Sequence, residues 1–260
     1  MNNVEEQRKL FDRMVRKYEI RAFIDKDPVK FSHRWREQVN REITGIIASW
    51  LAYGSRAVFL NVLEKLFTYM GELNSTPYRF IMDKRYIEMS RTHPVNKTLY
   101  RFYTYADFYD LCEVLHGIYT RHSTLEKAVY KTYVHDGLVT DLVASVTNLF
   151  NGEVKGIPAD VKSACKRINM FLRWMIRKDS PVDLGCWQMF SPNLLLMPLD
   201  THVARVGRQL NLITRNSDDM KTVIELTNAC REIFPDDPCR MDFALFGYGI
   251  EHPVKIAKDK

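Results

Sequence analysis

Apolar side chains recur at the spacing of an amphipathic helix along most of this chain, and this period most limits the folds open to it. In residues 42–50, for example, Ile43, Ile46, Ile47 and Trp50 fall on one side of a helix. No segment of useful length shows the two-residue alternation of a half-buried strand. We therefore predict an all-α protein. The expected helices span residues 1–16, 42–50, 58–70, 77–86, 105–120, 123–134, 138–150, 160–177, 201–211, 217–233 and 238–247.

Capping and turn residues predict where several of these helices begin and end. Gly54 and Ser55 weaken helix interiors, so they predict a break between the second and third helices. Asp237 before Pro238 is typical of an N-cap followed by proline in the first turn. The segment 178–198 loses the helical period and holds several prolines, which indicates a hinge or a junction between lobes.

The charge and the cysteines limit the class of protein. The chain has 38 Lys and Arg against 32 Asp and Glu, a net charge of +6 that permits a polyanionic partner without requiring one. Its longest apolar stretches are far shorter than the ~20 residues of a membrane span, and its first residues read as an ordinary helix rather than a leader. The five scattered cysteines argue against a disulfide framework, which predicts a cytoplasmic protein without a membrane segment.

Spacings typical of a metal or cofactor site are missing from the sequence. The seven histidines show neither an H-x-x-x-H nor an H-E-x-x-H pattern, and the cysteines contain no C-x-x-C pair. There is also no glycine-rich loop of the kind that cradles phosphate groups. We therefore predict a protein that holds no metal, no iron–sulfur cluster and no other cofactor.

Positive charge gathers between Lys162 and Lys178, a segment without a single acid. At a turn of about 100° per residue, one narrow arc of the expected 160–177 helix lies opposite an apolar arc. The residues of this arc are Lys162, Lys166, Asn169, Arg173 and Arg177. Like charges four apart repel on a helix, so a face of one sign favours binding of an anion such as a nucleic-acid backbone. A solvated surface helix is the simpler alternative.

Asp200 comes just before an apolar run at helical spacing, formed by Val203, Val206 and Leu210. This position predicts an N-cap, at which the carboxylate accepts hydrogen bonds from free backbone N–H groups. Position alone therefore favours a plain helix cap over a chemical role for Asp200.

The residues that follow Asp200 change that balance. Leu199-Asp200-Thr201-His202-Val203-Ala204-Arg205 resembles the catalytic-aspartate segment of helix-hairpin-helix DNA glycosylases. In the endonuclease III type this segment reads roughly V-D-T-H and, after two further residues, R. Three other segments, 52–56, 164–175 and 243–249, look like the signature of an uncharacterised bacterial family of this length. That family distantly resembles the glycosylases, and most closely the archaeal 8-oxoguanine glycosylase.

The resemblance implies a two-lobed helical domain like that of the glycosylases. A central lobe would span residues 36–190, and a second lobe would join 1–35 to 191–260, with the N-terminal helix packed against the C-terminal part. It also implies that a nucleic-acid base, in DNA rather than RNA, is flipped into a cleft between the lobes. Asp200 would then assist N-glycosidic cleavage by stabilising positive charge on the sugar or by orienting the attacking water.

Further residues take supporting roles in this hypothesis. Lys166 is a second catalytic candidate, and Tyr53 and Trp187 are candidates for stacking on a base. The candidate nucleic-acid or anion-binding residues are Lys162, Lys166, Asn169, Arg173, Arg177, His202 and Arg205.

Departures from the glycosylase pattern shape the expected chemistry. The place of the lyase lysine is taken by Val182, or by Asn169 on the archaeal-type alignment, and the glycine-rich hairpin is missing. This favours an aspartate-only reaction that leaves abasic sites without strand cleavage. Two non-catalytic alternatives stay open: a nucleic-acid-binding protein that kept the fold, and a helical interaction module whose basic face docks an acidic protein.

Overall fold

The structure is a computed structural model in which residues 3–133 and 137–253 are described. Helices dominate this part of the chain, and its sheet is a short antiparallel hairpin of β1 (Thr98–Tyr100) and β2 (Tyr103–Thr104). The all-α prediction is therefore confirmed. The hairpin escaped sequence prediction because strands of three and two residues are too short to show a period. No helix of the described ranges is long and apolar enough to cross a membrane.

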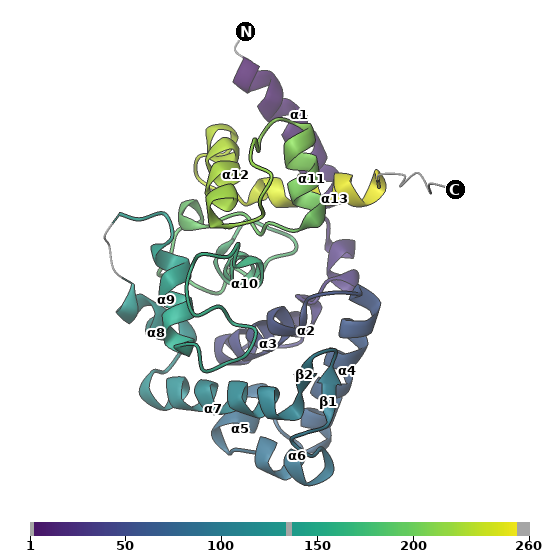
Figure 1. Cartoon of the computed structure of the whole chain (residues 1–260), viewed down its shortest axis with the longest axis vertical. Coiled ribbons are helices and arrows are strands. Elements are labelled where there is room, and N and C mark those ends of the chain that lie inside the picture. The colour runs from purple at the N-terminus through teal and green to yellow at the C-terminus, as the bar shows by residue number, and fades with distance from the viewer. Residues whose placement is uncertain (1–2, 134–136, 254–260) are drawn as a thin grey trace.

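One group of helices surrounds α3 (Gln38–Leu51), most of whose residues are buried (Figure 1). Its other members are α2 (Lys30–His33), α4 (Arg56–Glu72), α5 (Pro77–Met82), α6 (Tyr86–Thr92) and α7 (Tyr105–Arg121). The predicted break at Gly54 and Ser55 is confirmed, because α3 ends at Leu51 and α4 begins at Arg56.

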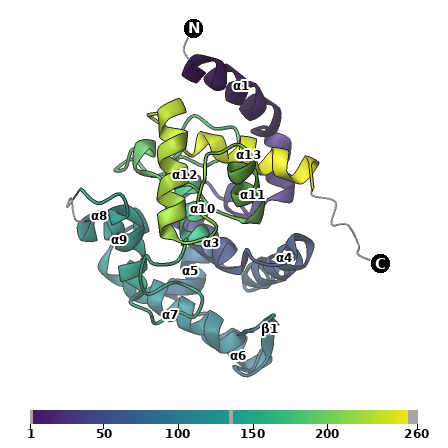
Figure 2. The same cartoon turned by 45° about the horizontal axis from the view of Figure 1, so that its top comes forward.

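A second group brings the two ends of the chain together. Helix α1 (Asn3–Tyr18) packs against α13 (Arg240–Glu251) and α12 (Met220–Ile233), and α13 also packs against α11 (Thr201–Gln209). Figure 1 and Figure 2 both show α1 beside these C-terminal helices. The approach is close at Gly247, where an added Cβ would lie 2.3 Å from the ring of Tyr18. The N-terminal helix thus packs with the C-terminal part as expected, while the boundaries near residues 36 and 190 stay a prediction.

Helix α10 (Lys166–Ile176) lies between the two groups (Figure 1). It packs against α3 and against α9 (Asp141–Phe150), which in turn packs against α8 (Leu125–Thr132). Its other side reaches α13 through an ion pair between Arg173 and Asp242. Two short 3-10 helices complete the described elements, η1 (Arg21–Lys26) and η2 (Pro192–Leu194).

Several helix starts differ from their predicted positions, and two of these differences change the assignment of a named residue. The helix expected over 160–177 begins at Lys166, so Lys162 lies in the preceding loop. The last helix begins at Arg240 with Cys239 at its N-cap, so the prediction of Asp237 as N-cap is wrong. Asp237 instead accepts a hydrogen bond from Arg177, at 2.8 Å from Nε. A distant arginine thus takes the carboxylate that the local pattern assigned to the helix end.

Candidate active site

A pocket of about 850 Å³ lies where the two groups of helices meet α10. Its walls come from the C-terminal end of α3, the first turns of α4, α10 and α11, and one side of α13. Segments that are far apart in the sequence therefore meet in this pocket. Asp200, Lys166, His202 and Tyr53, all singled out in the sequence, line it.

Asp200 caps α11, as predicted from the sequence. Its Oδ1 accepts hydrogen bonds from the backbone N–H groups of His202 at 2.9 Å and Val203 at 2.8 Å. Its Oδ2 lies 3.9 Å from Nζ of Lys166. One carboxylate oxygen is therefore committed to the helix end, while the other is left for a cation or a substrate.

Lys166 reaches Asp200 because it is the first residue of α10. Its side chain is 33% exposed, so the ammonium group is open to the pocket while it pairs with Asp200. Lys178, the other lysine near the glycosylase-like segment, is exposed beyond the far end of α10 and does not line the pocket. Of these two lysines, Lys166 is the one that the structure brings to Asp200.

Aromatic rings form one wall of the pocket. Tyr53 stacks on Phe102 with ring centroids 4.9 Å apart and an interplanar angle of 29°. Both rings line the pocket, together with Trp50 and Phe246. Tyr53 is half-buried, which suits the base-stacking role predicted for it. Trp50 is almost fully buried and belongs to the core as well.

The prediction that Trp187 stacks on a base is wrong in this structure. Trp187 is fully buried and lies outside the pocket lining. Its indole Nε1 donates a hydrogen bond to Oε1 of Glu42 at 2.8 Å. Glu42 is buried too and accepts further bonds from the Tyr119 hydroxyl and the Leu125 backbone N–H. Trp187 therefore secures an internal carboxylate, and it is unavailable to a ligand.

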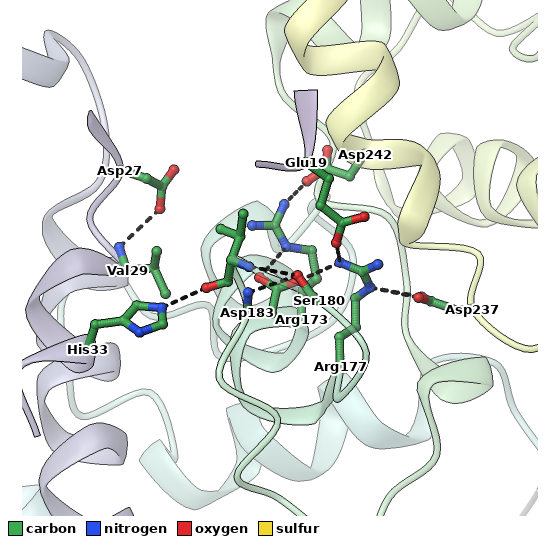
Figure 3. A network of polar contacts seen from close by, with 11 residues as sticks. Glu19, Asp27, Val29, His33, Arg173, Arg177, Ser180, Asp183, Asp237 and Asp242 are labelled. Atoms are coloured by element: carbon green, nitrogen blue, oxygen red, sulfur yellow. Dashed lines mark hydrogen bonds and ion pairs between the residues drawn. The ribbon is translucent and has the colours of Figure 1, made fainter. Parts of the chain in front are cut away.

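The prediction of one exposed basic face is also wrong. Arg173 and Arg177 are 4% and 2% exposed, and both are paired with acids of the same chain (Figure 3). Arg173 pairs with Asp183 and Asp242, and Arg177 pairs with Asp183 at 2.5 Å. These arginines face a buried acidic cluster in which Asp183 comes from the loop after α10 and Asp242 from the distant α13, so the charge pattern within residues 162–178 does not reveal it.

The loop after α10 brings Asp183 to both arginines. Gly185 has a φ of +54°, and an added Cβ would lie 2.6 Å from Cα of Lys178. This close return holds the loop against the end of the helix. Arg177 reaches two further acids, Glu19 at 2.8 Å and Asp237 at 2.8 Å. Burial lowers the pKa of Arg177, but Asp183, Asp237 and Glu19 raise it by more, so its charge is secured.

The other residues of the predicted arc also lie outside a common basic face. Asn169 is fully buried, and its amide donates to the Ala164 carbonyl at 3.0 Å. Lys162 is 89% exposed, but it lies in the loop before α10 and pairs with Asp160 at 3.1 Å. Of the five predicted anion-binding residues of this arc, Lys166 lines the pocket.

The two remaining candidates follow Asp200 on α11. His202 lines the pocket, and its ring meets the Phe246 ring edge-on with centroids 5.8 Å apart. Arg205 lies outside the pocket lining, and its Nη2 donates to the Gly249 carbonyl at 2.6 Å. Arg205 therefore ties α11 to α13, whereas His202 is placed to meet a ligand.

Four charged residues of the pocket were missed as candidates in the sequence: Asp27, Arg56, Arg167 and Asp218. Arg56 lies over the Phe246 ring, with its guanidinium carbon 4.9 Å from the centroid. Arg56 is the last residue of the segment 52–56, which carried part of the family resemblance, so the sequence did contain a signal that pointed to Arg56. Asp27 lies between η1 and α2, where the sequence shows no functional pattern around it.

The pocket holds cations, carboxylates and aromatic rings, and no metal-binding cluster is evident in it. Across residues 3–133 and 137–253, no group of three or more His, Cys, Asp and Glu side chains is placed to hold a metal ion. The main features of the site are therefore the ion pair of Asp200 with Lys166 and the aromatic rings of its wall, and we assign no residues to a cofactor.

Fold and site together define a helical protein with a charged, aromatic-walled pocket between two groups of helices. The chain belongs to a family described as a protein of unknown function, DUF2400, whose model matches residues 27–251. It matches no curated protein and no solved structure.

Proposed function

We propose that this protein recognises a nucleic-acid base in the pocket and cleaves the N-glycosidic bond of its nucleotide, with Asp200 as the catalytic carboxylate. The observation that carries the proposal is the pairing of Asp200 with Lys166 at 3.9 Å inside an aromatic-walled pocket of about 850 Å³. The resemblance of the segment around Asp200 to the glycosylases supports it. A two-lobed fold like theirs is part of the same proposal.

In this mechanism a base leaves the stack and enters the pocket, where Tyr53 and Phe102 offer a stacked pair of rings. As the glycosidic bond lengthens, positive charge grows on the sugar, and the carboxylate of Asp200 stabilises it or orients the attacking water. Such a group acts without moving, because two backbone N–H groups already hold it at the start of α11.

Phosphate contacts would come from other side chains around the pocket, since Arg173 and Arg177 of the predicted basic face are buried. Arg56, Lys166 and His202 line the pocket and are partly exposed. Burial of Arg173 and Arg177 also removes support from the alternative in which the basic face docks an acidic protein. A nucleic acid, with DNA favoured over RNA, is the partner that we propose.

The test is a panel of DNA duplexes and single strands with damaged bases, scored for abasic sites. Wild type is compared with Asp200→Asn, which keeps the helix cap and loses the negative charge. We expect excision to fall by about 10²-fold or more. Asp219→Asn is the matched control, because Asp219 caps α12 in the same way and lies outside the pocket lining.

Excision that survives Asp200→Asn would refute the role of Asp200. Failure of the wild-type protein to excise any base would favour the alternative of a binding protein without chemistry. Titration of DNA binding against salt then decides whether DNA is a partner at all. Binding through phosphates weakens steeply as salt rises, with a slope set by the number of phosphates neutralised.

A further inference from the structure

Besides Asp200, Asp27 places a carboxyl group in the pocket lining, and it comes from a segment that is far from Asp200 in the sequence. Asp27 is the C-cap residue that follows η1, is 5% exposed and lines the pocket. Its Oδ1 accepts one hydrogen bond, from the backbone N–H of Val29 at 3.0 Å. Asp27 is thus a nearly buried acid that forms part of the pocket wall.

Asp27 differs from the acids of the neighbouring arginine cluster. Figure 3 shows Arg173 joined to Asp183 and Asp242, while Asp27 is joined to Val29 alone. Within the described part of the chain, Asp27 forms no ion pair closer than 4 Å. Arg173 forms its ion pairs with Asp183 and Asp242, so it does not form one with the Asp27 carboxyl group.

The charges around Asp27 come from three elements. Arg173 of α10 and Arg56 of α4 favour its ionised form, and Asp183 of the loop after α10 opposes it. Burial is the largest effect, and it raises the pKa of Asp27 above the ordinary value of 3.8 in spite of the two arginines. Asp27 therefore holds its proton to a higher pH than an exposed aspartate does.

Asp200 has the opposite surroundings in the same pocket. It accepts two backbone N–H bonds and pairs with Lys166, all of which suit a carboxylate anion. Two carboxyl groups in one pocket, one buried without a partner cation and one held by backbone N–H groups and a lysine, form the arrangement that enzymes use for paired acid and base roles. Both groups assist cleavage of the N-glycosidic bond of a neutral base, because the sugar gains positive charge while the base gains negative charge.

Resting on the proposed function, we propose that Asp27 is a further catalytic residue, the general acid that protonates the departing base. As the C1′–N bond breaks, its electron pair goes to the base, and a ring nitrogen or exocyclic oxygen of the base takes the proton of the Asp27 carboxyl. The base leaves neutral and Asp27 becomes a carboxylate.

The remaining atoms balance through water. A water molecule forms the new C1′–O bond and gives its surplus proton to Asp200. Asp200 releases that proton to solvent, and Asp27 takes one back, so each turnover consumes one water and no net proton. Asp27 thus stabilises the leaving group, and Asp200 stabilises the sugar.

The test measures the pH dependence of excision by the full chain with wild type and Asp27→Asn. Asn keeps an oxygen to accept the Val29 N–H bond, and thermal melting confirms that the variant folds. We expect the rate to fall by about 10²-fold or more. The wild-type rate should also fall as pH rises through the raised pKa of Asp27, and this fall should vanish in Asp27→Asn. Asp25→Asn, an exposed carboxyl of the same 3-10 helix, is the matched control.

The leaving group supplies a second readout. N7-alkylated guanine already carries a positive charge and needs no proton to leave, so Asp27→Asn should slow its excision less than that of neutral bases. Equal losses for all bases, or an unchanged pH profile, would overturn the role of Asp27 while Asp200-dependent excision still stands. Absence of excision by the wild-type protein would overturn the proposed function and this inference together.

Discussion

The ammonium group of Lys166 lies 3.9 Å from Oδ2 of Asp200, and the two residues begin helices α10 and α11. Asp200 stabilises its helix, because a carboxylate at an N-cap accepts hydrogen bonds from free backbone N–H groups. Lys166 does not stabilise its helix, because a cation in the first turn lies at the positive end of the helix dipole. Helix stability therefore explains the position of Asp200 but not that of Lys166, and the pocket that both line offers the better reason.

We predict that Lys166 does not attack the sugar. An ammonium group in an ion pair has no electron pair with which to form a Schiff base, so abasic sites should appear without strand cleavage. Borohydride added during the reaction should trap no covalent complex on a denaturing gel.

A trapped complex would contradict this prediction. Its loss in Lys166→Gln, with retention in the exposed Lys178→Gln control, would make Lys166 the nucleophile and the reaction bifunctional. The same gel therefore separates the two chemistries that this acid–base pair allows.

The cap formed by Asp200 should be measurable apart from any activity. Asp200→Ala leaves the N–H groups of His202 and Val203 without their acceptor, so we expect a loss of about 1 kcal/mol in the free energy of unfolding. Asp200→Asn should stay within a few tenths of a kcal/mol of wild type. Urea denaturation measures both, and an Asn variant as unstable as the Ala variant would contradict the assignment.

The sequence predicted what depends on neighbouring residues. The cap at Asp200, the break at Gly54 and the start of α7 at Tyr105 all follow from signals within a few positions. Lys166 and Tyr53 were also found, since each lies in a segment that carried a family resemblance.

Residues whose role depends on distant partners were misread. Arg173 looks like a surface cation because its own segment holds no acid, but Asp242 meets it from α13. Trp187 looks available in an irregular segment, yet Glu42 of α3 holds its indole. Asp27 gave no signal, because the burial that raises its pKa exists only in the folded chain. Local patterns cannot show such pairings.

Loss of one partner from the buried cluster should be costly. Arg177→Ala would leave Asp183 and Glu19 buried without their shared cation, so we expect a loss of about 3–5 kcal/mol in the free energy of unfolding. Denaturant unfolding followed by circular dichroism measures it. The exposed neighbour Lys178 supplies the control, since Lys178→Ala should change stability by less than about 0.5 kcal/mol. Similar effects of the two substitutions would show that the cluster does not carry this stability.

Asp242 should make stability depend on pH in the mildly acidic range. Burial raises the pKa of its carboxyl from 3.8 to about 6, and the nearby Asp200 adds to this while Arg173 opposes it. The folded state then binds this proton more tightly than the unfolded state, so its contribution to stability is largest below about pH 4. That contribution falls as pH rises toward about 6 and is level above it.

Asp242→Asn tests this directly, because the amide does not titrate and its oxygen still accepts a hydrogen bond from Arg173. Between pH 4 and 6 the free energy of unfolding should therefore decline less in the variant than in wild type. Urea denaturation at half-unit intervals of pH gives both slopes, and the exposed Asp236→Asn should keep the wild-type slope. Parallel slopes in wild type and Asp242→Asn would mean that the buried carboxyl releases its proton as readily in the folded chain as in the unfolded one.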